Sequence, residues 1–323
     1  MIWLIWRQHR KQLLFTVAAL VALAATMVPT GLAMHAKYDS LGLGPCRATF
    51  GSASLITQTE AVSRCESLSH QFQQEYAGMV FIAVLFVVLP VLVGVFFGAP
   101  LVAREVEQGT HRLVWTQGVT RLQWALAKFG LVGAMTTVLA VGYALGMSWW
   151  FRPLVSASSG RLNYLSFDVQ GIVPIAYTLF ALALGVFAGT YLRKVLPAMG
   201  IALVGFAAVR VAVEVLARPR YLPTQSLTFS PAGDQTPNPA AGNWVMDLGV
   251  RNAAGELVLP NAQLGPCPPG GCGDTVAGPG AQNWVHYQPG DRFWLFQGIE
   301  TGIFVFLAAA LVFFALRRVR TIA

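Results

Sequence analysis

Three charged side chains stand inside stretches that are otherwise apolar. Arg210 and Glu214 interrupt the segment 195–217, and Glu300 interrupts the segment 293–316. Arg210 and Glu214 are four residues apart and so lie on one face of a helix. At a rise of 1.5 Å per residue, Arg210 and Glu300 lie about 10 Å from the nearer end of their segments. If these segments cross a lipid bilayer, isolated charges at that depth are costly, so they pair with each other or face a cavity. We predict that Arg210, Glu214 and Glu300 form a polar cluster near an outer gate; the alternative is a structural ion pair or side chains that reach the headgroups.

The motifs of ATP-binding, metal and hydrolytic sites are missing from the sequence. It contains no Gly-Lys pair, so it lacks the GxxxxGK[ST] loop that cradles ATP phosphates. It has no HExxH motif, its five histidines are scattered, and no nucleophile elbow occurs. We therefore expect no catalytic residue, no metal site and no cofactor in this chain, and we do not expect it to be an enzyme by itself.

The elements that must position these charges are membrane spans. Of the 323 residues, 55% are apolar and 11% charged, against about 25% charged in soluble domains; the mean hydropathy is +0.57. The net charge of +8 could suit nucleic acid, but the basic residues lie beside the apolar segments, as membrane anchors do. Six segments reach the length of about 20 residues that crosses a bilayer: residues 13–34, 77–98, 127–151, 169–192, 195–217 and 293–316. We expect an all-α polytopic membrane protein with six transmembrane helices.

The first 12 residues form a distinct stretch. Trp3 and Trp6 are one helical turn apart and a basic cluster follows. This pattern favours an interfacial helix on the inner leaflet, and a plain basic flank of the first span is the alternative. A cleavable signal peptide would have an apolar core of about 7–15 residues, and the segment 13–34 is longer.

The distribution of basic residues predicts the orientation. With the N-terminus inside, the inner pieces are residues 1–12, 100–128, 193–194 and 317–323, which hold 12 Lys and Arg and two acids. All other positions hold 10 basic and 12 acidic residues. Because basic residues stay on the cytoplasmic side, we expect a multi-pass protein of the cell membrane with both termini in the cytoplasm.

The four cysteines agree with this orientation. Cys46 and Cys65 fall in the outer loop 35–76, and Cys267 and Cys272 fall in the outer segment 218–292. Disulfides form on the oxidising side of the membrane. Pairing Cys46 with Cys65 and Cys267 with Cys272 is the simplest of three connectivities; free thiols are the alternative, and a zinc site lacks a second ligand pair.

The outer segments have some predicted structure of their own. Residues 54–76 lack Pro and Gly and can be helical. Residues 244–252 and 257–260 flank an Ala-Ala-Gly-Glu turn, which predicts a β-hairpin. We expect the segment 218–292 to form an extracellular cap with some β structure, before the last span and the tail at 293–323.

GxxxG pairs occur in four of the predicted spans. Small residues at this spacing let helices approach closely within a bundle or across a dimer interface. The four pairs are Gly94/Gly98, Gly142/Gly146, Gly185/Gly189 and Gly298/Gly302.

The cytoplasmic connection 100–128 carries the most specific pattern. Residues 101–108 read as a short amphipathic helix, Gly109 breaks it, and Thr110 can cap a second helix at 111–115. A Gln-Gly-Val-Thr turn follows at residues 117–120, then Arg121, and Lys128 opens the third span. This order resembles the loop between spans two and three of ABC-2-type transporter permeases. The start Trp6-Arg7-Gln8 and the stretch 287–294 are similar to actinobacterial members.

The resemblance implies the membrane-spanning subunit of an ATP-driven exporter, coupled to ATP hydrolysis on another chain. It implies two permease subunits, identical or related, and two copies of an ATP-binding subunit that carries ATP and Mg²⁺. The loop between spans two and three would then be the coupling element that docks on the ATP-binding subunit. By position, the contact would be carried by Arg104, Glu105, Glu107, Gly109, Thr110, His111 and Arg112.

Alternatives stay open at the level of the sequence. The segment 218–292 is long, where minimal exporters of this type have a short re-entrant pair of helices. The apolar spans favour a hydrophobic or amphipathic substrate. The competing functions are a non-transporting sensor or mechanotransmission subunit driven by an ATPase, and a membrane scaffold without one. The coupling loop could also be an ordinary solvated connection. We expect membrane lipid as a partner and no nucleic acid.

Overall fold

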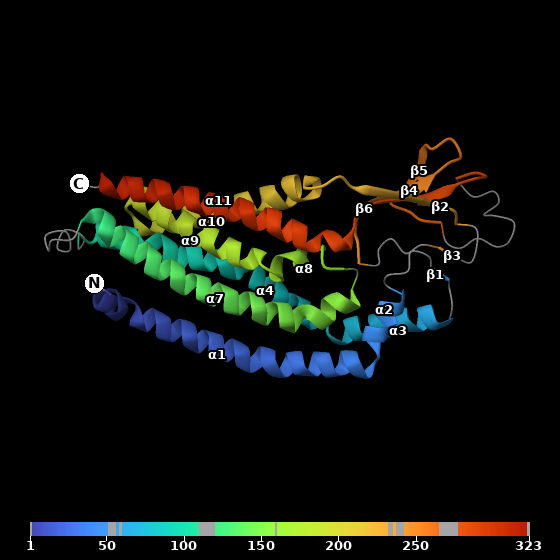
Figure 1. Ribbon diagram of the computed structural model, residues 1–323, viewed down its shortest axis with the longest axis horizontal. Coiled ribbons are helices and arrows are strands. Elements are labelled where there is room, and N and C mark those ends of the chain that lie inside the picture. The colour runs from blue at the N-terminus through green and yellow to red at the C-terminus, as the bar shows by residue number, and fades with distance from the viewer. Residues whose placement is uncertain are drawn as a thin grey trace.

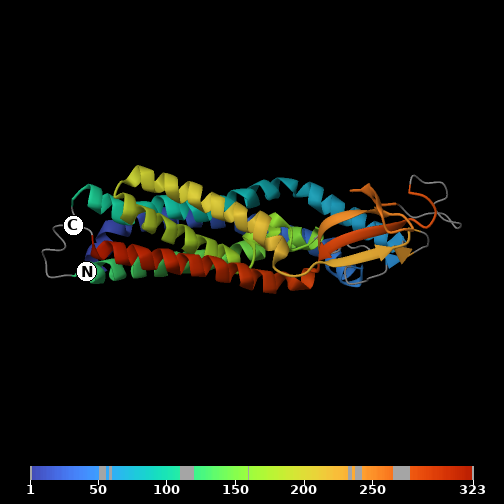
Figure 2. The same cartoon turned by 90° about the horizontal axis from the view of Figure 1, so that it is seen from above.

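Long helices lie side by side along one axis in the computed structural model. It describes residues 2–50, 56–57, 60–109, 120–158, 160–231, 235–236, 242–264 and 277–321. A small sheet lies at one end of the bundle, which we call the sheet end. Both chain termini lie at the other end, the termini end (Figures 1 and 2).

Five stretches of the described residues are helical, long enough and apolar enough to cross a membrane. They are Ala77–Glu107, Arg121–Ala157, Val173–Leu192, Val195–Arg220 and Gly290–Arg320. They contain α4 (Ala77–Val93), α5 (Ala99–Glu107), α7 (Arg121–Ala157), α9 (Val173–Leu192), α10 (Val195–Ala212) and α11 (Phe293–Arg320). The chain is therefore a multi-pass membrane protein.

The first predicted span lies in α1 (Ile2–Ser40). This helix runs without interruption through residue 12, where a boundary between an interfacial helix and the span was expected. The count of six spans and the interfacial placement of residues 1–12 stay predictions.

The second span is longer than the sequence predicts. A π-helical segment, η1 (Gly94–Gly98), joins α4 directly to α5, so the amphipathic stretch 101–108 continues the span instead of forming a separate helix. Pro100 lies in the first turn of α5, where its missing N–H is tolerated next to the widened π-turn.

The centre of the bundle is α9, packed against the second span through glycines. A Cβ atom at Gly185 would collide with the backbone of Gly94 and Ala99, and one at Gly189 would collide with the carbonyl oxygen of Ala99. Gly94 and Gly98 meet the backbone of α9 in the same way. Two of the four GxxxG pairs therefore form one tight helix contact, as small residues in membranes commonly do.

The other two GxxxG pairs make no such contact. At Gly142, Gly146, Gly298 and Gly302, an added Cβ would have no heavy atom of the described residues within 4 Å. The same motif thus marks a packed surface in α9 and an open one in α7 and α11.

A short turn joins α9 to α10, as the basic pair between the two apolar segments predicts. Arg193 adopts a φ of 57° and ends α9, and α10 begins at Val195. The two helices therefore form a tight antiparallel hairpin.

The sheet end combines the two connections that the sequence places there. After α1 come α2 (Leu43–Phe50) and α3 (Glu60–Glu75), which a Cys46–Cys65 disulfide joins with 6.0 Å between the Cα atoms. Short strands β1 (Ile56–Thr57) and β3 (Gln235–Thr236) pair, which links this connection to the later one. Cys267 and Cys272 lie outside the described residues.

The larger sheet has four antiparallel strands in the order β2-β6-β4-β5. They are β2 (Gln225–Phe229), β6 (Gln282–Gln288), β4 (Trp244–Arg251) and β5 (Leu257–Pro260). Strands β4 and β5 form the hairpin predicted from the sequence, and its turn is held by Asn252 Oδ1, which accepts from the Glu256 N–H at 2.9 Å.

Side chains tie this sheet to the spans. Gln288 donates to the carbonyl oxygen of Leu222 at 2.7 Å, and Arg292 donates to that of Pro223 at 2.6 Å. Asn243 Oδ1 accepts from the Gly290 N–H at 2.9 Å. The sheet is therefore fixed to the start of α11 and to the segment that follows α10.

We predict opposite effects for the same substitution at two glycines. Gly185→Ala forces a Cβ into the backbone of η1, and such overpacking costs about 1–3 kcal/mol. Gly142→Ala meets open space, so the higher helix propensity of Ala, by about 1 kcal/mol, should leave stability equal or higher. Thermal unfolding of the purified protein in detergent checks both; equal melting temperatures for the two variants would contradict the prediction.

Candidate functional site

A group of buried charges lies inside the bundle near the sheet end. We call it the ionic cluster: Asp168, Tyr177, Arg210, Arg218 and Glu300. Its members come from α8 (Tyr164–Val169), α9, α10, η3 (Arg218–Arg220) and α11. Arg218 and Glu300 are 0% exposed, and Asp168 and Arg210 are 6% exposed. Charges so far from water must be compensated inside the protein.

Arg218 is the central cation of the ionic cluster. Its Nε and Nη2 donate to the two carboxylate oxygens of Glu300 at 2.9 and 2.8 Å, which is a bidentate pair. Its Nη2 also donates to Asp168 Oδ1 at 2.8 Å. The Cζ atom of its guanidinium lies 4.3 Å from the ring centre of Phe167. One arginine therefore holds α8 and α11 together.

Arg210 neutralises the second carboxylate oxygen of Asp168. Its Nη2 forms an ion pair with Asp168 Oδ2 and lies 3.9 Å from Glu214. Its guanidinium stacks 4.0 Å from the ring centre of Tyr177. The Nε and Nη1 groups of Arg210 have no hydrogen-bond partner among the described residues.

Two tyrosines complete the coordination of Glu300. The Tyr177 hydroxyl donates to Glu300 Oε1, and the Tyr221 hydroxyl donates to Oε2 at 3.1 Å. Burial raises the pKa of Tyr221, and the negative charge of Glu300 raises it further. Tyr221 therefore stays neutral and acts as a hydrogen-bond donor.

Gln297, one helical turn before Glu300, fixes the start of α9. Its Oε1 accepts from the N–H groups of Ile172 and Val173 at 2.9 Å each, and its Nε2 donates to the carbonyl oxygen of Phe167 at 3.0 Å. The first N–H groups of a helix lack partners within the helix. A fully buried glutamine supplies them here, and it fixes α11 against α8 and α9.

The ionic cluster is balanced in charge. Two guanidinium groups face the carboxylates of Asp168 and Glu300, and Glu214, with a side chain 24% exposed, adds one negative charge at the rim. No group of three or more His, Cys, Asp or Glu in the described part of the chain could hold a metal ion. The arrangement suits holding helices in a defined position.

The predicted polar cluster was incomplete. Arg210 and Glu300 do lie in one cluster, but the direct partners of Glu300 are Arg218 and Tyr177, and the direct partner of Arg210 is Asp168. Sequence reasoning missed Asp168 and Arg218 because each lies one residue outside an apolar segment. The spacing of Arg218, eight residues after Arg210, was the available signal.

A second feature lies at the termini end, where α5 carries the residues predicted to couple to a partner. Lys128 of α7 donates to Glu105 at 2.5 Å, and their side chains are 4% and 16% exposed. Glu107 accepts from the Val195 N–H at 3.0 Å and so caps α10. Val102 packs with Trp124 and Val319. The short helix α5 therefore contacts α7, α10 and α11 together.

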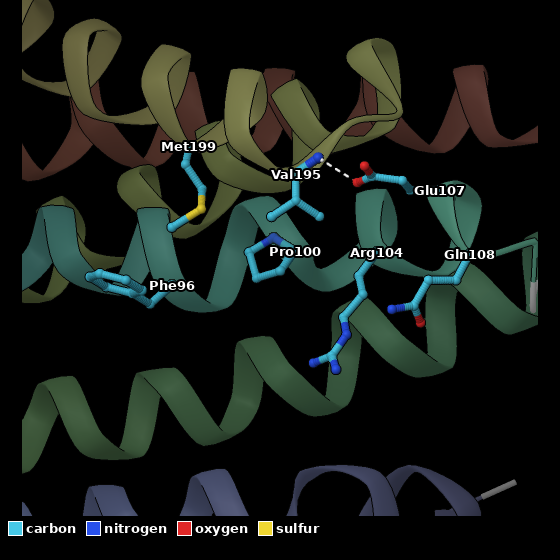
Figure 3. Close-up of a pocket in the computed structure, with 7 residues that line it drawn as sticks. All are labelled: Phe96, Pro100, Arg104, Glu107, Gln108, Val195 and Met199. Atoms are coloured by element: carbon cyan, nitrogen blue, oxygen red, sulfur yellow. Dashed lines mark hydrogen bonds between the residues drawn. The ribbon is translucent and has the colours of Figure 1, made fainter.

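A groove of about 530 Å³ runs beside α5. Phe96, Pro100, Val195 and Met199 supply its apolar walls, and Arg104, Glu107 and Gln108 supply its polar edge (Figure 3). Figure 3 shows Glu107 directed toward Val195, whereas Arg104 points away from α10. Arg104 is exposed and its charge is accessible.

The remaining predicted coupling residues are only partly described. Gly109 adopts a φ of 69°, a conformation that favours glycine, directly after the end of α5. Thr110, His111 and Arg112 lie outside the described residues, as does the predicted helix 111–115. The next described helix, α7, starts with a capping box in which Thr120 accepts from the Gln123 N–H at 3.2 Å.

The family model named ABC-2 membrane transporter related matches residues 17–218, more than half of the chain. The chain belongs to this family. No curated protein and no solved structure matches it.

Membership in the family gives the two features a common context. Members are ABC-2-type permeases, the membrane components of ABC transporters, which normally work with an ATP-binding subunit and are not themselves catalytic. The matched region contains α5, the groove and four members of the ionic cluster, and it ends at Arg218. Glu300 and the four-stranded sheet lie beyond it.

We predict strong energetic coupling between Glu300 and Arg218. Removing one partner of a buried ion pair costs about 3–5 kcal/mol, because the other charge stays buried and uncompensated. Glu300→Leu and Arg218→Met should each destabilise the permease by that order, and the double variant should lose far less than the sum, since Asp168 keeps Arg210. A double-mutant cycle from unfolding in detergent measures this.

The exposed pair Lys37–Glu75 is the matched control. Its side chains are 35% and 43% exposed at 3.2 Å, so its coupling energy should be at most about 1 kcal/mol. Additive losses at Glu300 and Arg218 would show that the ionic cluster does not act as a unit.

Proposed function

We propose that this permease is the membrane-spanning subunit of an ATP-driven exporter. ATP and Mg²⁺ are bound by a separate ATP-binding subunit, present in two copies, and a second permease subunit, identical or related, completes the complex. The observation that carries this proposal is the set of contacts of α5. A force on α5 acts at once on α7 through Glu105–Lys128 and on α10 through Glu107–Val195.

The proposed orientation puts the termini end in the cytoplasm of a cell with this protein in its plasma membrane. The basic residues support it: Arg317, Arg318 and Arg320 occupy the last turn of α11 at that end. The Cys46–Cys65 disulfide at the opposite end supports an oxidising exterior. In this orientation α1 also crosses the membrane, which brings the number of spans to six. The helix α5 and the groove then face the ATP-binding subunit.

The coupling residues divide into two roles in this proposal. Arg104 and Gln108 are exposed at the groove and can touch the partner, with residues 110–112 following. Glu105 and Glu107 act as positioning residues, because their carboxylates already bind Lys128 and the start of α10. The partner surface that fits Arg104 is acidic.

The ionic cluster is proposed as the outer gate. It joins the sheet-side ends of α9, α10 and α11, so spans that move relative to one another must break or exchange its ion pairs. The Nε and Nη1 groups of Arg210 have no partner among the described residues and can donate to a carboxylate that has moved. The exposed, apolar surfaces of the spans favour a hydrophobic or amphipathic substrate.

A second candidate function, mechanotransmission without transport, has one specific observation in its favour. The four-stranded sheet is fixed to α11 and to the end of α10 through Gln288, Arg292 and Asn243. Movement of these spans would therefore move the sheet as a unit. Stimulation of ATP hydrolysis by a translocated amphiphile favours export; movement of the sheet without such stimulation favours mechanotransmission.

Charge reversal at Arg104 tests the proposed docking. Arg104→Glu should weaken association with the proposed ATP-binding subunit by at least about tenfold, because like charges then meet at the interface. Co-purification and binding titration of the co-expressed pair measure it. Arg152→Glu is the control, because Arg152 is also exposed but lies at the sheet end of α7. Equal affinity of the Arg104 variant and the control would refute docking at α5.

Neutralising Glu300 tests the gate. Glu300→Gln keeps the shape of the side chain and removes the charge that Arg218 binds. We expect the complex to assemble and to hydrolyse ATP, with transport in proteoliposomes lowered by roughly tenfold or more, since hydrogen bonds to charged groups contribute about 1.5–3 kcal/mol. Transport at the wild-type rate would assign the ionic cluster a purely structural role.

A further inference from the structure

An apolar cavity of about 350 Å³ lies between α1, α4 and α7. Its walls come from residues 23–28 of α1, residues 86–93 of α4 and residues 136–149 of α7, with Phe97 and Thr178. The four α1 residues lie one to two turns before Gly31, where α1 meets the rings of Trp149 and Trp150. This volume falls in the range of about 300–1,000 Å³ that is typical of ligand sites.

The GxxxG pair of α7 forms part of the cavity wall. Gly142 and Gly146 both line it, and a Cβ at either would have no heavy atom of the described residues within 4 Å. The pair therefore hollows the surface of α7 beneath α1, whereas Gly185 and Gly189 are filled by a neighbouring backbone.

The lining excludes a polar ligand. The described residues that line the cavity include no charged side chain. The Tyr143 hydroxyl donates to the carbonyl oxygen of Phe86 at 3.0 Å, and the Thr178 hydroxyl donates to that of Pro174 at 2.7 Å. A sugar or an ion would lose its hydration here and find few partners, because Thr136 and Trp149 are the remaining lining residues with polar side-chain groups. A hydrocarbon requires none.

The mouth and the length of the cavity match a lipid chain. Val28 and Val138 line the cavity and are 47% and 71% exposed, and their helices α1 and α7 lie side by side in the bundle (Figure 1). A mouth on the side of a membrane span opens to the hydrocarbon of the bilayer. From Thr136 to Trp149 the wall extends about 20 Å at 1.5 Å per residue, and half of the hydrocarbon core is about 15 Å thick.

We infer that this cavity binds one acyl chain of a membrane lipid. The chain enters sideways between α1 and α7 and lies along Gly142 and Gly146, in contact with the partly exposed Met27, Val93 and Leu139. This site requires no ATP-binding subunit. A test of lipid binding can therefore fail without contradicting the proposed export, and the reverse also holds.

The probe is a phosphatidylcholine that carries a diazirine in one acyl chain, added to the delipidated full-length protein in detergent. After illumination, mass spectrometry of peptides locates and counts the label. We expect saturable labelling, competed by unmodified phosphatidylcholine, at Met27, Val93 and Leu139. Labelling of the exposed Phe306 of α11 should stay unsaturated.

The variant Gly142→Leu/Gly146→Leu fills the cavity with side chains and should lower the saturable label severalfold. Gly130→Leu is the matched control: it lies on the same helix, also in open space, outside the cavity, and should label as the wild type does. Retention volume and melting temperature verify folding of each variant. Unchanged saturable labelling in the double variant would overturn the inference. A second copy of the chain that covers the cavity and excludes the lipid would also overturn it. Such a copy would be detected as Val138→Cys dimers that are cross-linked through that position.

Discussion

Compensation of buried charge is the constraint on which the sheet end of this protein depends. Arg218 and Glu300 are fully buried, and Asp168 and Arg210 are nearly so. Four helical segments must meet at one place to satisfy them. The π-helical segment η2 (Val213–Ala217) makes this geometry reachable. Arg218 follows Arg210 by eight residues, which exceeds two α-helical turns by about 0.8 residue. A π-helical turn holds roughly one residue more than an α-helical turn. The side chain of Arg218 therefore returns to the helix face that carries Arg210.

The central helix α9 connects the ionic cluster to the termini end. Its first turns carry Tyr177 and receive Gln297, and Tyr177 and Phe180 pack edge-to-face on Phe304 of α11. Its last turns carry Gly185 and Gly189, which lie against the backbone of η1 and α5. Because both contacts are tight, a displacement of α5 is transmitted along α9 with little room for local adjustment.

The helix α1 is held differently. It contacts α7 where Gly31 admits the rings of Trp149 and Trp150, and the Trp150 indole donates to the Thr30 hydroxyl at 3.0 Å. His35 stacks on Trp149 one turn later. Toward the termini end the glycines of α7 leave space that no described side chain fills. The bundle therefore combines a tightly packed centre at α9 with a hollow flank at α1, and the same small residues produce both.

The sequence by itself determined five of the membrane spans and the β-hairpin. An apolar stretch of about 20 residues satisfies its backbone hydrogen bonds in a bilayer only as a helix, and the Ala-Ala-Gly-Glu turn between alternating segments specifies antiparallel pairing. The order of residues in the loop after span two was also enough to indicate the family. These are local properties, readable from neighbouring residues.

Only the tertiary structure decided which of the distant residues meet. Arg218 binds Asp168, which is 50 residues away in the sequence, and Tyr177 binds Glu300, which is 123 residues away. Hydropathy placed Asp168 and Arg218 just outside the spans, because it measures a segment and not the helices packed around it. The same holds for glycine: Gly142 and Gly185 have identical local spacing, and one faces a cavity while the other faces a backbone. Packing between segments that are remote in sequence sets that difference.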